Sequence, residues 1–64
     1  MTKTQELKHI YKLLRNLGIQ RTAILKWMLT ANHVFFDTTP MKMVLGGRGD
    51  AVIKTLEAFS RKVL

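Results

Sequence analysis

The sequence predicts a compact four-helix, all-α domain that spans residues 1–64 and begins with a helix-turn-helix-like pair. Three segments carry apolar side chains three or four residues apart, which is the spacing of one helical face. Between them stand glycine, proline and threonine residues of the kinds that start and stop helices. The chain has 64 residues and no cysteine, so one small core without disulfides must hold it together.

The first helix is expected between Thr4 and Leu17. Its apolar stripe consists of Leu7, Ile10, Tyr11, Leu14 and Leu17. Thr2 and Gln5 have the spacing of a capping box, in which each side chain accepts a hydrogen bond from the other residue's backbone N–H. Gly18 suits the position just after the helix, because glycine readily adopts the left-handed conformation found there.

A second helix is expected from Gln20 to about Ala31, with the apolar residues Ile24, Trp27, Met28 and Ala31 at helical spacing. Leu25 and Leu29 widen this face, which suggests burial on two sides or a subunit contact. The helical pattern breaks at Asn32 and His33. The apolar run Val34-Phe35-Phe36 that follows is either an extended bridge or a loop that plugs the core, and its spacing does not decide between them.

A short third helix and a longer fourth helix complete the expected domain. Thr39 is predicted to cap the third helix and Pro40 to occupy its first position, where a missing N–H costs nothing. The stripe of this helix is Met41, Val44 and Leu45, and Gly46-Gly47 ends it. Asp50 is expected to cap the last helix, which runs from Ala51 to Leu64 with the stripe Val52, Leu56, Phe59 and Val63.

Charge is the strongest indication of a binding partner. Eleven Lys and Arg residues against four Asp and Glu residues give a net charge of +7. Such a balance favours nucleic acid, an anionic membrane surface or an acidic protein. In the helix-turn-helix interpretation, the second helix places four residues near base edges, namely Gln20, Arg21, Thr22 and Lys26. The residues expected on phosphates are Lys8, Lys12, Arg15, Lys42 and Arg48. The alternative is that these charges are ordinary solvated faces.

No constellation in the sequence points to catalysis, a metal or a cofactor. His9 and His33 stand far apart, and neither has a second histidine or a carboxylate at the spacing expected of metal ligands. The four acidic residues are scattered singly, and the one serine, Ser60, has no histidine base near it in the sequence. No apolar run is long enough to cross a bilayer and no signal peptide is evident, so we expect a cytoplasmic protein without a membrane partner.

From Ala23 onward the chain resembles the C-terminal toxin-binding domain of the Xre/MbcA/ParS antitoxin family. The matching residues are Ala23, Trp27, Leu29, Asn32, Thr39-Pro40-Met41, Gly47 or Gly49, Val52 and Leu56. The resemblance covers about two-thirds of the chain, and its Thr-Pro and glycine elements are moderately specific. It implies a small helical module that dimerises and blocks a toxin, usually beside a separate DNA-binding domain. Phe35-Phe36-Asp37 stands where that family commonly has a Leu-Gly-Gly-like loop.

The combined hypothesis is a non-enzymatic DNA-binding regulator of the transcriptional repressor type, working as a homodimer on double-stranded DNA. Candidates for the core or the dimer surface are Leu25, Trp27, Leu29, Phe36, Met43 and Phe59. The alternative, from the protein-interaction class, is an antitoxin-like module that binds and neutralises a toxin enzyme. The two hypotheses differ in whether binding depends on a DNA sequence or on a protein partner.

Overall fold

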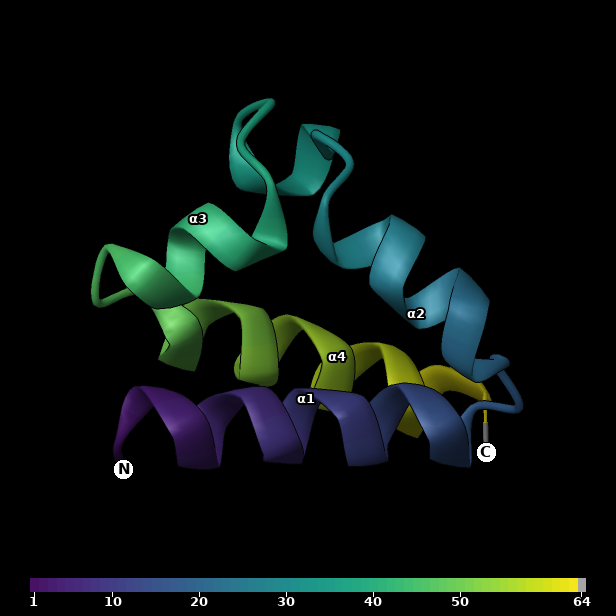
Figure 1. Ribbon diagram of the computed structural model, residues 1–64. Coiled ribbons are helices and arrows are strands. Elements are labelled where there is room, and N and C mark those ends of the chain that lie inside the picture. The colour runs from purple at the N-terminus through teal and green to yellow at the C-terminus, as the bar shows by residue number, and fades with distance from the viewer. Residues whose placement is uncertain (64) are drawn as a thin grey trace.

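The chain folds into four α-helices and one 3-10 helix, in the order α1 (Lys3–Asn16), α2 (Arg21–Met28), η1 (His33–Phe35), α3 (Pro40–Leu45) and α4 (Gly49–Val63) (Figure 1). This computed structural model describes the backbone of residues 1–63 and the side chains of residues 1–60. Within the described backbone the only pairing of extended residues is a single bridge between Asn32 and Thr38. The predicted all-α, four-helix class is confirmed.

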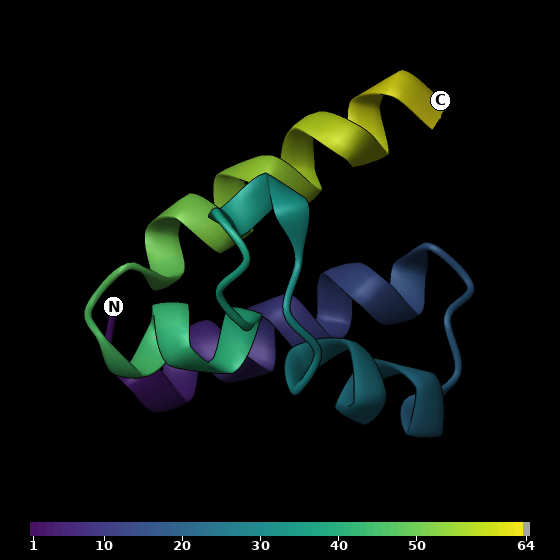
Figure 2. The same cartoon turned by 90° about the horizontal axis from the view of Figure 1, so that it is seen from above.

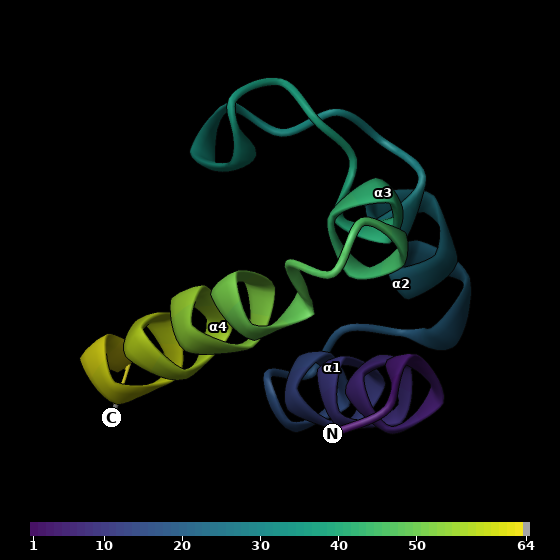
Figure 3. The ribbon, with the colours of Figure 1, turned by 90° about the vertical axis from the view of Figure 1, so that its left-hand side faces the viewer.

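The two long helices, α1 and α4, define the frame of the molecule. They begin at the same end of the molecule, run in the same general direction and move apart toward their carboxyl ends (Figure 2). At the close end the Glu6 carboxylate lies against Gly49, the first residue of α4. In the view of Figure 3, α2 and α3 lie together on one side of α1 and α4, and the loop that carries η1 extends away from α2 and α3. The divergence of α1 and α4 leaves room for a groove.

Local hydrogen bonds set the starts of α1 and α3 as the sequence predicts. Thr2 and Gln5 form the capping box, with the Gln5 N–H 3.1 Å from Thr2 Oγ1 and the Thr2 N–H 2.8 Å from Gln5 Oε1. Thr39 Oγ1 accepts from the Lys42 N–H at 3.1 Å, and Pro40 is the first residue of α3. Gly18, just after α1, has a φ of 86°, a conformation that glycine adopts without strain.

Two predicted boundaries are wrong. The second helix ends at Met28 instead of Ala31, because the chain turns toward the loop, where the Asn32 N–H donates to the Thr38 carbonyl at 3.2 Å. The last helix begins at Gly49, so Asp50 lies in its first turn and is not the N-cap. The reason is the tight reversal before it, in which the Arg48 N–H donates to the Met43 carbonyl at 2.7 Å. Asp50 still lies at the positive end of the helix dipole.

The core gathers side chains from every element. Val44 and Val52 are fully buried at its centre. The other members are Ile10, Leu14, Ile24, Met28, Phe35, Met43, Ile53 and Leu56. Several members of the predicted stripes lie outside it, because no other element covers them at their positions: Tyr11, Ala31, Leu45 and Phe59 are exposed. The expectation for the Val63 side chain falls outside the described side chains.

The apolar run Val34-Phe35-Phe36 after α2 inserts Phe35 into the core and leaves the Phe36 ring in solvent. Phe35 is only 3% exposed, whereas Phe36 is 89% exposed. The chain reverses there, with the Thr38 N–H donating to the Phe35 carbonyl at 3.1 Å. Phe36 and Asp37, the two central residues of this turn, have φ values of 56° and 62°. Positive φ at both central residues is the pattern of a type I′ turn, which normally selects Asn and Gly.

Candidate functional site

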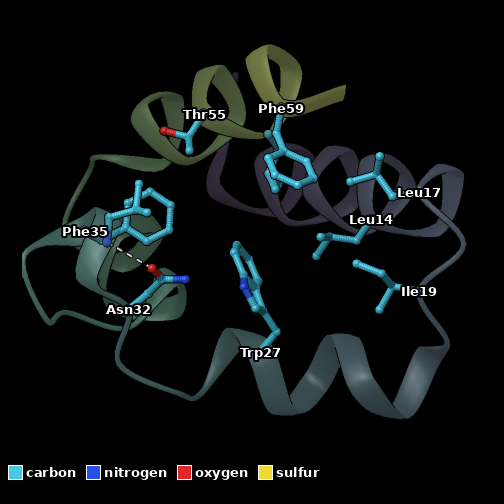
Figure 4. Close-up of a pocket in the computed structure, with 10 residues that line it drawn as sticks. Leu14, Leu17, Ile19, Trp27, Asn32, Phe35, Thr55 and Phe59 are labelled. Carbon is cyan, nitrogen blue, oxygen red and sulfur yellow. Dashed lines mark hydrogen bonds between the residues drawn. The ribbon is translucent and has the colours of Figure 1, made fainter. Parts of the chain in front are cut away.

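A groove opens between α2 and the second half of α4, where α4 has diverged from α1 (Figure 4). Its volume is about 290 Å³. Three helices, the turn between α1 and α2, and the loop after α2 contribute to its lining. The lining residues are Leu14, Leu17, Ile19, Trp27, Asn32, Val34, Phe35, Thr55, Leu56 and Phe59.

Two aromatic side chains face each other across this groove. Trp27 projects from α2 and Phe59 from α4, and both point into the space between the helices (Figure 4). The Trp27 ring lies edge-on to Phe35, with ring centroids 6.2 Å apart and planes at 78°. This arrangement fixes the indole from one side. Phe59 is 58% exposed, so the opposite wall is largely open to solvent.

The chemistry of the groove is apolar. The polar side-chain groups among its lining residues are the Asn32 amide, the Thr55 hydroxyl and the indole N–H of Trp27, and the first two take part in hydrogen bonds within the chain. Asn32 Oδ1 accepts from the Val34 N–H at 3.0 Å, and Thr55 Oγ1 donates to the Ala51 carbonyl at 2.8 Å. The Asn32 oxygen and the Thr55 hydroxyl therefore have partners within the chain. The surface that remains suits apolar side chains, because their burial there removes hydrocarbon from water.

A second hollow lies on the other side of the loop that carries η1. It is lined by Val34, Phe35, Phe36, Met43, Arg48, Asp50, Ala51 and Thr55. Val34, Phe35 and Thr55 line both hollows, so the loop stands as a partition between them. The exposed Phe36 ring and the Arg48 guanidinium therefore border one depression, next to the groove.

The structure does not bring the predicted DNA contacts into one group. Lys8, Lys12 and Arg15 share the outer side of α1, whereas Arg21 and Lys26 belong to α2. Arg48 belongs to the turn between α3 and α4, and this turn lies at the opposite end of the molecule from the start of α2 (Figure 1). All nine residues, which include Gln20, Thr22 and Lys42, are exposed.

The outer face of α2 is also less polar than a base-reading helix requires. Leu25 is 59% exposed and Leu29, the residue that ends the helix, is 66% exposed. Lys26 is a surface neighbour of Leu29, three residues on, and projects to a different side of the helix from Leu25. Exposed leucines at this spacing are more typical of a protein contact than of contacts to polar base edges.

The residues proposed for the core or a dimer surface divide into three groups. Met43 is buried in the core of the single chain, so it is not a surface contact. Trp27 is half-buried and forms a wall of the groove. The remaining four are exposed, namely Leu25, Leu29, Phe36 and Phe59. Of these exposed residues, only Phe59 lines the groove.

Each histidine lies beside a carboxylate, contrary to the expectation from spacing. His33 Nδ1 lies 3.2 Å from Asp37 Oδ1, because the tight turn brings these two residues together. His9 Nε2 lies 3.9 Å from Glu57 Oε2, a contact between α1 and α4. Both pairs are partly or fully exposed. Within the described part of the chain no three His, Asp or Glu side chains gather in the way a metal ion requires.

The sequence patterns predict no groove: they place Leu17 and Val34 in apolar segments and Asn32 at the break after the second helix, and they do not single out Thr55. No local signal marks them, since the groove exists only because two helices diverge.

Comparison with protein families, curated proteins and solved structures gave no match. Over residues 1–63 no helix has both the length and the apolar character needed to span a bilayer.

Proposed function

We propose that this chain is a non-catalytic protein-binding module of the antitoxin-like kind, whose groove takes apolar side chains of an acidic partner protein. The observation that carries the proposal is the groove itself, with Trp27 and Phe59 facing each other across it. Large aromatic side chains in a concave apolar site are the usual anchors of protein interfaces. The resemblance to the toxin-binding domain supports a partner of the toxin enzyme class.

The charge of the chain argues for an acidic partner over a second copy. A net charge of +7 attracts an acidic protein over long range and speeds its association. Two copies of the chain would bring the same positive charge together. In this proposal the groove supplies the apolar contact area, and the surrounding positive charge selects an acidic partner. Interfaces commonly combine these two contributions.

The DNA-binding repressor hypothesis receives less support at α2. Leu25 and Leu29 occupy the outward face on which a recognition helix needs polar side chains. Neither leucine lines the groove, and Leu25 borders a separate hollow with Leu7, Tyr11 and Met41. The proposed partner contact therefore centres on the groove.

A peptide titration tests this proposal. The probe is a designed helical peptide with leucines along one face and glutamates elsewhere, and the readout is the emission of Trp27, the only tryptophan in the chain. We expect the emission to shift to the blue and to saturate as the peptide covers the indole. Phe59→Glu is expected to raise Kd at least about tenfold, which corresponds to about 1.4 kcal/mol.

Leu45→Glu is the matched control, because Leu45 is 57% exposed and lies on α3 outside the groove. It should change Kd less than about twofold, a surface effect. A peptide with the same composition and scrambled leucine positions should not shift the emission. Equal losses for the two variants would contradict the groove as the binding site. Sedimentation equilibrium would identify a second copy as the occupant, if dimerisation of the protein alone were lost with Phe59→Glu.

A further inference from the structure

The side of α1 that points away from the core is basic along most of its length. Lys8, Lys12 and Arg15 follow one another at spacings of four and three residues, so they lie in one row on the helix surface. Ile10 and Leu14 occupy the opposite side and are 1% and 2% exposed. We call Lys8, Lys12 and Arg15 the α1 stripe. In Figure 1, α1 forms one outer edge of the molecule, with the other helices all on one side of it.

The charges of the α1 stripe are not neutralised by neighbours. Glu6 is the one acidic residue of α1, and its carboxylate is turned toward Gly49 of α4. Within the described side chains both ion pairs involve histidines, and the three cations of the stripe form none. One N–H of the Arg15 guanidinium donates to the Ile19 carbonyl at 3.3 Å. That bond positions the group, and its other N–H donors stay free for a ligand.

The stripe has the chemistry of a phosphate-backbone site. Its three members are cations, and the exposed apolar side chains near it, Met1 and Tyr11, lie at its edge, whereas a protein interface would place a large anchor at its centre. The other apolar residues of α1 pack in or against the core, so the helix has no continuous apolar face to insert into a lipid surface. Three cations spread over roughly 10 Å of helix fit a dense and regular row of negative charges, as duplex nucleic acid presents.

We propose that the α1 stripe is a second binding surface, which holds the phosphate backbone of duplex nucleic acid through Lys8, Lys12 and Arg15. It is separate from the groove, because Leu14, which lines the groove, projects from another side of α1. The chain binds both partners at once, with α1 between them. This surface replaces α2 as the contact with nucleic acid and makes no contact that depends on the base sequence.

Fluorescence anisotropy with a labelled DNA duplex tests the assignment. One variant combines Lys8→Gln, Lys12→Gln and Arg15→Gln. The control combines Lys26→Gln, Lys42→Gln and Lys54→Gln, which removes the same charge from exposed lysines on α2, α3 and α4. Three phosphate contacts predict a slope of about −2.7 for log K against log salt, or about a 40-fold loss of affinity from 50 to 200 mM salt.

We expect the stripe variant to lose most of this slope and to bind at least about tenfold more weakly at low salt. The control variant should keep a slope within about one unit of the original. Circular dichroism of both variants should match the original chain, because all six residues are exposed. The duplex should leave Trp27 emission unchanged and should not displace the acidic peptide.

Three results would overturn the proposal. Equal losses in the two variants would mean that diffuse charge, and not the stripe, binds the duplex. Anionic phospholipid vesicles that bind as tightly, with the same dependence on the stripe, would reassign the surface to membranes. Displacement of the acidic peptide by the duplex would show that the two ligands share one surface.

Discussion

Replacing Phe36 by glycine is expected to stabilise the free protein, although it removes a large apolar side chain. Phe36 has a φ of 56°, in the left-handed region that costs a residue with a side chain about 1–2 kcal/mol. The ring is 89% exposed, so its removal loses almost no burial. Glycine adds about 0.5–1 kcal/mol of entropy to the unfolded chain, which opposes folding.

The difference leaves a gain of about 0.5–1 kcal/mol, or a rise of roughly 2–8 °C in Tm for a domain of this size. Thermal unfolding followed by circular dichroism, with urea titration as a second measurement, gives both quantities. Val34→Gly is the matched control: Val34 is 61% exposed in the same loop but lies in η1 and has no positive φ. That variant should lose about 0.5–1 kcal/mol.

If Phe36→Gly lowered the stability as Val34→Gly does, the strain argument for this turn would be wrong. A strained and exposed aromatic residue is most easily explained by a contact outside the folded chain. Phe36 borders the hollow next to the groove, where a partner that fills the groove would reach it.

Three further substitutions test how the fold is held. Thr39→Ala removes the cap of α3 and should cost about 1 kcal/mol in urea unfolding, whereas Thr39→Ser should restore most of it. Val44→Ala, at a side chain with 0% exposure, should cost about 2–3 kcal/mol, against less than about 0.5 kcal/mol for the exposed Leu45→Ala. Gly49→Ala would place a Cβ 2.5 Å from Glu6 Oε1, so we expect it to lower the free energy of unfolding. In a Glu6→Ala background this loss should vanish or become a gain, which a double-mutant cycle of unfolding free energies measures.

Features that depend on neighbouring residues could be predicted from the sequence. The capping box of Thr2 and Gln5, the cap at Thr39 and the left-handed glycine at position 18 all form between atoms a few residues apart. Helical spacing also identified most of the core. These predictions succeeded because a helix end satisfies its free backbone groups locally, whatever the rest of the chain does.

The tertiary structure alone decided which apolar side chains stay outside. Phe35 and Phe36 are chemically identical neighbours, yet a turn closed by the Asn32–Thr38 bridge buries the first and exposes the second. Phe59 continues the stripe of Val52 and Leu56, but it is exposed because α4 has moved away from α1 by that point. Spacing along one helix fixes the direction of a side chain, whereas its burial requires a second element packed against the helix at that residue. The groove and its two aromatic walls arise from this difference.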